Sequence, residues 1–291
     1  MLDGFVAERP RLLSVAHRIL GSVHDAEDAV QMAWLRVQTM HAGDIDNVPA
    51  WLTTVVTRVC LDQLRDRQRR DALTRRADTA PDTDLAADEE FLVREDVSRA
   101  LMVLLDRLTP PQRVAFVLHD LFGIPFDQIA DVLATTPASA KKHASRARVR
   151  IRPDQPAVTA ASDADAQHHA IVTAFLQAAG GGDVVRMIEL MAPDCVRIAD
   201  GSLIPPGTPT RVSGAAAVAA ETRHFVDRIR ASTPMRVNGR AVHVIAPGGH
   251  PVAAIDVGTR GGVITCITIA PIVVTDEVRA VSVQPSGKCD L

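Results

Sequence analysis

The chain has 291 residues, of which 47% are hydrophobic and 23% are charged, and its formal net charge is −3 at pH 7. This length and composition predict two or three domains, each with enough apolar residues to bury a core. A slightly acidic chain is not a protein that coats DNA over its whole surface. Any contact with nucleic acid is therefore expected at a local surface.

The four cysteines are scattered, with neither a CxxC pair nor a His/Cys cluster at zinc spacing: Cys60, Cys195, Cys266 and Cys289. We therefore expect no disulfide framework, no metal site and no cofactor. No uncharged apolar run reaches membrane-spanning length, and the N-terminal residues lack the apolar stretch of a signal peptide. The expected location is the cytoplasm, without contact with a membrane.

Helical periodicity fills residues 1–76, which form the first predicted domain. One helix is expected over 5–20 and a second over about 22–40, with acidic residues in its first turn. The second helix has a single apolar stripe and leaves four residues toward its other side: Asp28, Gln31, Leu35 and Arg36. A loop follows, and Pro49 opens a third helix that starts apolar. Its C-terminal part is basic, since residues 58–76 hold seven arginines against three aspartates.

Composition marks two linkers. Residues 77–96 hold eight acidic side chains against one arginine, which is typical of an acidic linker that runs into a helix. Residues 153–167 are rich in Pro, Ala and Asp and predict a second linker. The remaining domains are expected at 97–152, which is helical, and at 168–291.

The end of the second domain has the pattern of a helix-turn-helix. A short helix over 126–134 is followed by a tight turn and by the stretch 138–152, which holds six Lys or Arg residues and no acidic one. Small or apolar residues recur there at i, i+4, i+7 and i+11, a seam that lets the last helix lie close to the preceding one: Ala140, Ala144, Ala147 and Ile151. An isolated basic helix end can also be explained by its own dipole. The turn and the partner helix favour a DNA-binding surface instead.

Three segments of the first 152 residues resemble the extracytoplasmic-function sigma factors of bacterial RNA polymerase. DAEDAVQMAWLRV is similar to a conserved helix of region two, and PAWLTTVVTRVCLDQLRDRQRR is similar to the helix that follows it. QRVAFVLHDLFGIPFDQIADVLATTPASAKKHASRAR is similar to region four, the helix-turn-helix. The three segments occur in the family's order.

The resemblance implies roles for particular residues. The surface that docks on the β′ subunit of core RNA polymerase corresponds to Asp28, Gln31 and Leu35, although these could also form an ordinary exposed helix face. The part that binds the −10 promoter element corresponds to Trp51, Arg58, Arg65 and Arg69, of which Trp51 could be a core residue. The helix that binds the −35 element corresponds to Ser139, Lys141, Lys142, Ser145 and Arg146. Pro137 to Ser139 correspond to the start of this helix, where backbone N–H groups can hold a phosphate.

The sequence departs from the family at the turn, which reads ATTP where many relatives have a glycine. Ala140 also stands where a larger aliphatic residue is usual. Both changes predict a somewhat different turn and a closer approach of the last helix. Base preference is therefore not transferable from a relative.

Residues 168–291 predict an α+β domain: two or three helices, then strands near 236–246, 252–259, 263–274 and 278–284. This order resembles the SnoaL-like cone-shaped fold, which a subgroup of these sigma factors carries after region four. Enzymes of that fold use a carboxylate base and a tyrosine, and this chain has no tyrosine. The remaining candidates for acid or base are more typical of turns and edge strands: Asp194, Asp200, Asp256 and His243. We expect no catalysis, and a cavity for a ligand is the more probable use of the fold.

The sequence therefore predicts a sigma factor that binds promoter DNA and the β and β′ subunits of core RNA polymerase. With no dedicated anti-sigma partner visible, the C-terminal domain is expected to regulate the sigma domains within the same chain. Two alternatives stay open at this point. One is a helix-turn-helix regulator with a small-molecule-sensing domain, and the other is a SnoaL-type isomerase or cyclase with a DNA-binding appendage.

Overall fold

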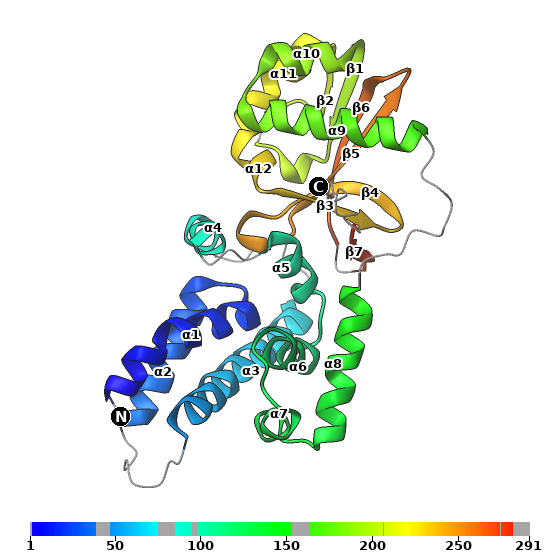
Figure 1. Cartoon of the computed structure of the whole chain (residues 1–291). Coiled ribbons are helices and arrows are strands. Elements are labelled where there is room, and N and C mark those ends of the chain that lie inside the picture. The colour runs from blue at the N-terminus through cyan, green and yellow to red at the C-terminus, as the bar shows by residue number, and fades with distance from the viewer. Residues whose placement is uncertain are drawn as a thin grey trace, which may run out of the picture. The chain divides into compact units, whose positions relative to one another are not determined.

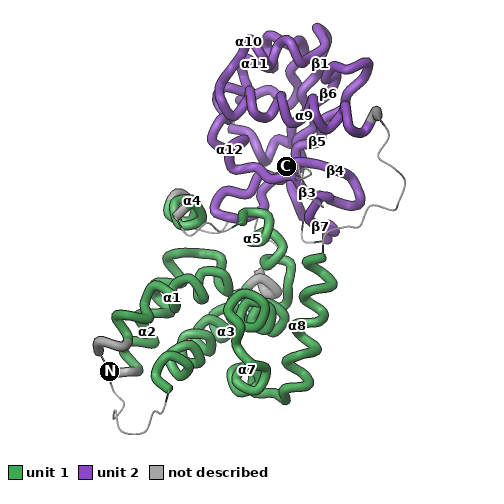
Figure 2. The backbone as a smooth tube through the Cα atoms, in the orientation of Figure 1, with its two compact units in different colours: residues 1–152 green, residues 153–291 purple. Residues whose placement is uncertain are grey.

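The computed structural model describes residues 2–38, 47–74, 85–94, 98–152, 163–205, 207–273 and 275–281. The chain forms two compact units, residues 1–152 and residues 153–291 (Figure 2). In the described residues the first unit is helical, and the second combines helices with one sheet (Figure 1). The predicted fold class, helical domains followed by an α+β domain, is confirmed.

The first unit begins with three helices that pack on one another: α1 (Leu2–Leu20), α2 (Val23–Gln38) and α3 (Val48–Thr74). The apolar stripe predicted for α2 is buried at Ala26, Ala29, Val30 and Ala33. Trp34 continues this stripe, and its ring lies 4.7 Å from the ring of Phe5 on α1. The small residues of α2 let its neighbours approach closely, so the core of this bundle consists mainly of side chains from α1 and α3.

Helix α4 (Leu85–Arg94) lies inside the segment 77–96, for which the sequence predicts an acidic linker running into a helix. Its Asp88 is 1% exposed and accepts a 2.6 Å hydrogen bond from the Val23 N–H at the start of α2. Phe91 packs against His17 of α1, with ring centroids 4.3 Å apart and the ring planes tilted by 44°. Part of the acidic segment is therefore structural, because one of its carboxylates satisfies an N–H group at a helix N-terminus.

The remaining helices of this unit are α5 (Arg99–Asp106), α6 (Pro110–Phe116), α7 (Phe126–Leu133) and α8 (Pro137–Ile151). Residues Val117–Leu121 continue α6 as a π-helical turn, η2, which periodicity did not predict. Ser98 caps α5, a capping box of Thr109 and Gln112 starts α6, and Thr136 caps α8. The predicted helix-turn-helix is confirmed as α7 and α8.

The alanine seam of α8 is fully buried at Ala140, Ala144 and Ala147. It packs against both α6 and α7, whereas the sequence predicted contact with α7 alone. Core residues from all parts of the unit form one cluster, and α3 contacts α6 and α7 directly. The two helical domains expected from the sequence therefore share a single hydrophobic core.

The second unit begins with α9 (Asp163–Gly181) and α10 (Val184–Leu190), and α11 (Ala215–Thr222) and α12 (Val226–Arg230) follow the first two strands. Helix α9 starts five residues before the predicted boundary at His168. A 3₁₀ turn, η4 (Arg223–Phe225), separates α11 from α12. The second unit contains a seven-stranded sheet of order β2-β1-β6-β5-β4-β3-β7.

The strands are β1 (Met191–Ala199), β2 (Arg211–Ser213), β3 (Ser232–Val237), β4 (Arg240–Ile245), β5 (Ala253–Arg260), β6 (Val263–Pro271) and β7 (Val278–Ala280). Strands β1 and β6 are parallel, and the other pairs are antiparallel. The helices pack on the sheet around a core that includes Phe175, Met187, Val218 and Ile264 (Figure 1).

One predicted strand of this sheet is wrong. Residues 236–246 do not form one strand, because Asn238 and Gly239 make a tight turn between β3 and β4, with φ of 51° and 79°. Asn-Gly is the dipeptide that such two-residue hairpin turns favour, since both positions need positive φ. The dipeptide was the signal that separates the two strands.

A prediction concerns the turn before α8. Helix α7 ends at Ala134, whose φ of 51° and ψ of 52° lie in the left-handed region where glycine is usual. Alanine pays a steric penalty there, which exceeds the entropy cost of glycine. Ala134→Gly should therefore raise the free energy of unfolding by about 0.5–1 kcal/mol. Urea denaturation measures this change.

The matched control is Ala138→Gly, an exposed position in the first turn of α8 with helical backbone. There the substitution should lower the free energy of unfolding, by about 0.5–1 kcal/mol. A decrease for both variants would show that the left-handed residue carries no strain.

Candidate functional sites

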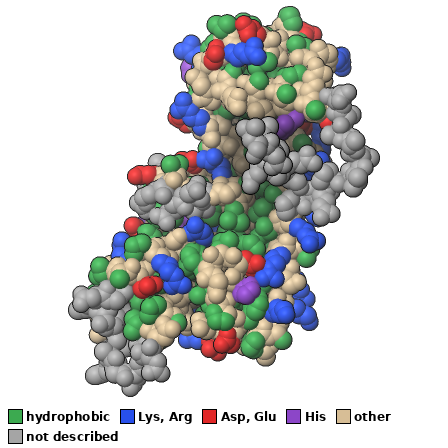
Figure 3. All heavy atoms as spheres, viewed as in Figure 1, with side chains coloured by type: hydrophobic (Ala, Val, Ile, Leu, Met, Phe, Trp, Pro, Cys, Tyr) green, Lys and Arg blue, Asp and Glu red, His purple; other side chains and the backbone are tan. Residues whose placement is uncertain are grey.

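The solvent face of α8 is basic. Lys141, Lys142, Ser145 and Arg146 are exposed, and Figure 3 shows Lys and Arg side chains gathered over this helix. Among the described residues, no carboxylate forms an ion pair with Lys141, Lys142 or Arg146. The buried alanine seam fixes the backbone beneath them. The arrangement is an exposed cationic helix face on a rigid support.

Two other cations of α8 are engaged within the protein. Arg148 pairs with Asp120 at 2.6 Å, and Arg150 donates to the Gln112 side-chain oxygen at 3.2 Å. These contacts tie α8 to the end of η2 and to α6. Sequence reasoning did not separate the engaged arginines from the unengaged ones.

The start of α8 offers fewer N–H groups than expected. Pro137 has no N–H, and the Ser139 N–H donates to the Thr136 hydroxyl at 3.2 Å. Ser139 is itself half-buried, and its hydroxyl accepts from Thr136 at 3.0 Å. Only the Ala138 N–H is left among these three residues, so the predicted phosphate site at the helix start is weakened.

The residues assigned to the −10 element lie on one face of α3, at positions i, i+7, i+14 and i+18: Trp51, Arg58, Arg65 and Arg69. The three arginines are exposed, whereas Trp51 is half-buried and packs against the core. Arg65 and Arg69 pair with aspartates on the same helix, Asp62 and Asp66. Exposed pairs of this kind are weak, so both guanidinium groups can exchange them for a phosphate.

The same face of α3 meets the helix-turn-helix. The Arg58 guanidinium donates a 2.9 Å hydrogen bond to the Asp131 carbonyl on α7. Another arginine of this basic stretch, Arg67, has a structural role: it donates to the Leu20 carbonyl at 3.0 Å and pairs with Asp25. The basic stretch of α3 therefore divides into cations that hold the bundle together and cations that face outward or toward α7.

Arg113 lies at the junction of α6 with α1 and is only 4% exposed. Its Nε donates to the Arg18 carbonyl at 3.0 Å, and its Nη1 lies 3.5 Å from Asp106. Burial lowers the pKa of this guanidinium, and the Asp106 charge opposes the shift. Burial likewise raises the pKa of the Cys60 thiol on α3, so this cysteine is a neutral core residue. Arg113 was not predicted as a functional residue. Its only sign in the sequence is a single cation beside an apolar run.

The residues assigned to polymerase docking are exposed on α2. Asp28, Gln31 and Leu35 lie on its outer side, and Asp28 is 3.8 Å from the imidazole of His24. Leu35 is 54% exposed, and Met32 beside it is 43% exposed. Sequence analysis missed Met32. Two exposed apolar side chains beside a carboxylate and an amide fit a protein-binding surface better than a purely solvated face.

The four possible acid or base groups of the second unit are scattered over different elements. Asp194 is exposed on β1, and Asp256 on β5 pairs with Arg240 at 2.8 Å. Asp200 caps a 3₁₀ turn, where hydrogen bonds from Ser202 lower the pKa of its carboxyl. Burial, together with the nearby His169, lowers the pKa of His243 on β4 to about 4, so its ring is neutral at pH 7.

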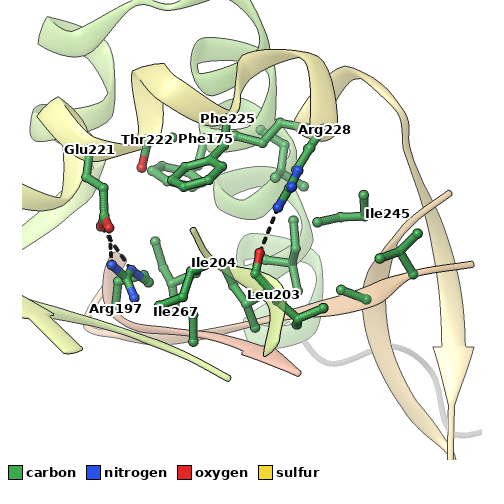
Figure 4. A pocket seen from close by; sticks show the side chains of 17 residues that line it. Phe175, Arg197, Leu203, Ile204, Glu221, Thr222, Phe225, Arg228, Ile245 and Ile267 are labelled. Atoms are coloured by element: carbon green, nitrogen blue, oxygen red, sulfur yellow. Dashed lines mark hydrogen bonds and ion pairs between the residues drawn. The ribbon is translucent and has the colours of Figure 1, made fainter. Parts of the chain in front are cut away.

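One cavity of this unit has about 780 Å³ of empty space, including the solvent at its mouth (Figure 4). None of these four groups lines it. Its titratable lining residues are Arg197, Glu221 and Arg228. Of these, Arg197 and Glu221 form an ion pair with each other.

Comparison with known proteins agrees with the helical unit. Residues 5–70 match the family model of sigma-70 region 2, and residues 98–151 match that of sigma-70 region 4. In the described part of the chain, no helix is long and apolar enough to cross a membrane.

The chain is 41% identical over 215 residues to the ECF RNA polymerase sigma factor SigJ of Mycobacterium tuberculosis, covering 72% of this chain and 68% of SigJ. It is 35% identical over 193 residues to the probable ECF RNA polymerase sigma factor SigI of the same species, covering 64% of this chain and 65% of SigI. The crystal structure of the M. tuberculosis extracytoplasmic function sigma factor SigJ aligns with 93% of this chain and 96% of that chain, with a TM-score of 0.44 and 32% identity. Because both sigma-70 regions match and the chain is 41% identical to SigJ in sequence, the chain belongs to the extracytoplasmic-function sigma factors of RNA polymerase.

Proposed function

We propose that this sigma factor directs core RNA polymerase to promoters in the cytoplasm through three surfaces of its helical unit. The α8 face binds the −35 element, the outer face of α3 binds the −10 element, and the outer face of α2 docks on the β′ subunit, with further contacts to β. The observation that carries the proposal is the exposed cationic face of α8. Its Lys141, Lys142 and Arg146 have no ion-pair partner in the described residues, while its opposite face is buried.

The geometry of α8 suits the major groove. A helix presented by a helix-turn-helix enters that groove with the residues of its N-terminal half toward the bases. Lys141, Lys142, Ser145 and Arg146 all lie in the first ten residues of the fifteen-residue α8. Lysines supply phosphate contacts, and an arginine can make two hydrogen bonds to guanine. Arg148 and Arg150, which are held by Asp120 and Gln112, then keep the helix in place.

Binding of the −10 element requires a cationic surface for the phosphates of a single strand and apolar or aromatic surface for its bases. Arg58, Arg65 and Arg69 supply charge along one face of α3, and Trp51 supplies a partly exposed ring. Arg58 is bonded to α7 in this structure. We propose that regions two and four separate when the promoter binds, which frees this face of α3.

The second unit is proposed to regulate the helical unit in cis. The segment between α8 and α9, residues 153–162 inside the predicted linker 153–167, is short, so it keeps the second unit at high effective concentration near region four. The acidic residues of 78–96 outside α4 can add to this regulation by competing with DNA for the arginines of α3 or the cations of α8. No dedicated anti-sigma partner is needed in this scheme.

Membership in the sigma family decides against a plain helix-turn-helix regulator, which has no need of a polymerase-docking face on α2. We also propose that the second unit is not an enzyme. Its possible acid and base groups lie on separate elements and outside the cavity, and the one carboxylate in the cavity wall, Glu221, is held by Arg197. A general base must reach the substrate proton within hydrogen-bond distance.

Three single substitutions test the role of the α8 face. Lys141→Ala, Lys142→Ala and Arg146→Ala should each weaken binding of duplex DNA by the helical unit. The measurement is the dissociation constant over a series of salt concentrations. Each lost phosphate contact should make the slope of log K against log salt shallower by about one. A lost base contact should instead cost about 1–3 kcal/mol on the promoter alone.

Arg148→Ala is the matched control, because it removes the same charge from the same helix but from a side chain already paired with Asp120. It should lower stability and change the salt slope less than the other three. If the slope of log K against log salt were the same for all four variants and the parent chain, α8 would not be part of the DNA interface.

The docking surface gives the next prediction. Asp28→Ala combined with Gln31→Ala should weaken binding to core RNA polymerase by about 1–2 kcal/mol, the range of important interface residues. Both side chains are exposed, so the melting temperature should stay within about 2 °C. The control is Glu90→Ala, an exposed carboxylate on α4. A large fall in melting temperature with unchanged affinity would mean that the two residues are structural.

Regulation in cis is tested by a chain that ends at Arg152, where the helical unit ends. Transcription in vitro at matched polymerase and salt should differ between this chain and the full chain by more than about threefold, because a tethered competitor changes the population of free sigma surfaces. The comparison is made over a range of sigma concentrations. Equal activity throughout would show that the second unit does not regulate under those conditions.

A further inference from the structure

The cavity of the second unit has two apolar walls. Phe175 on α9 and Phe225 on η4 form one wall, and Ile267 on β6 lies opposite them (Figure 4). The cavity holds about 780 Å³ including the solvent at its mouth, which sets an upper limit on ligand size. Apolar walls with few polar groups are typical of small-molecule sites.

One polar end of this cavity is already satisfied. Arg197 is 5% exposed, and its guanidinium pairs with both carboxylate oxygens of Glu221. It also donates to the Thr210 carbonyl at 3.1 Å and to the Pro209 carbonyl at 3.0 Å. A buried charge that is paired and hydrogen-bonded in this way has no charge left for a ligand. This end therefore closes the cavity and does not attract an ion.

The other polar group, Arg228 on α12, is different. Its side chain is exposed, donates one 2.7 Å hydrogen bond to the Leu203 carbonyl and lies 5.7 Å from the centre of the Phe225 ring. Figure 4 shows the guanidinium reaching from the helix toward Leu203 at the side of the cavity away from Glu221. A guanidinium has five N–H donors, so most of them remain for another acceptor. In the described residues no carboxylate pairs with it.

We propose that this cavity binds an apolar small molecule that carries one anionic group, with the apolar body between the phenylalanine and isoleucine walls and the anion on Arg228. The charges of the cavity lining select this ligand. The lining has three charged side chains, two of which cancel, and a single positive charge remains at the opening. The site lies within the second unit, so its test is independent of the proposed polymerase and promoter surfaces.

The test uses two dyes with nearly the same apolar body. 1-Anilinonaphthalene-8-sulfonate carries one sulfonate, and N-phenyl-1-naphthylamine is its neutral counterpart. Both should bind the full chain saturably, as measured by fluorescence titration. Arg228→Met should raise the dissociation constant of the sulfonate dye by roughly threefold to tenfold, the range expected for one exposed charge-assisted hydrogen bond. The same substitution should change the dissociation constant of the neutral dye by less than about twofold.

Two further variants make the test specific. Arg223→Met removes an exposed arginine on η4 that does not line the cavity, and it should leave the dissociation constants of both dyes unchanged. Ile204→Trp adds bulk to the cavity lining and should weaken both dyes by more than about fivefold, with the fold checked by circular dichroism. The proposal would be overturned if Arg228→Met weakened the binding of both dyes equally or of neither. Unchanged dye binding by a folded Ile204→Trp variant would also overturn it. If that variant does not fold, Leu203→Trp replaces it under the same criteria.

Discussion

A buried positive charge constrains the helical unit. The Arg113 guanidinium is 4% exposed, and its partners come from different parts of the chain, the Arg18 carbonyl on α1 and Asp106 at the end of α5. A charge left unpaired in such a place costs several kcal/mol, roughly 3–5 when one partner of a buried pair is removed. The hydrogen bond from Arg113 to the Arg18 carbonyl lasts only while α6 stays packed on α1, whereas its ion pair with Asp106 lies within region four. Together with the Arg58 contact to α7, it holds regions two and four in one compact unit with a common core.

This packing bears on the function of the sigma factor. The α8 face points to solvent, whereas the α3 face is partly covered by α7 through Arg58. The two proposed DNA-binding surfaces are therefore not equally accessible in this arrangement. A sigma factor that must hold two promoter elements needs both, so separation of the two regions becomes a step at which the second unit, and any ligand in its cavity, could act.

The sequence predicted the elements whose periodicity is set by a buried face. The stripe of α2 and the alanine seam of α8 were found because burial repeats at helical spacing. It did not predict the partners of individual charges, because Arg67, Arg113, Arg148 and Arg197 look like any surface arginine until residues far along the chain are placed beside them. The β3–β4 turn was missed for a local reason, the Asn-Gly dipeptide inside an apolar run. Which cations are unpaired, and so suited to DNA, is a property of the folded chain alone.

The most direct measurement is resonance energy transfer between dyes on Gln68 of α3 and Ala138 of α8, two exposed positions in regions two and four. It is recorded while core RNA polymerase, and then promoter DNA, is added to the full chain. We predict saturable binding to the polymerase and a fall in energy transfer as α3 and α8 separate. No binding would contradict the sigma function, and binding with unchanged transfer through promoter addition would contradict the separation of the two regions.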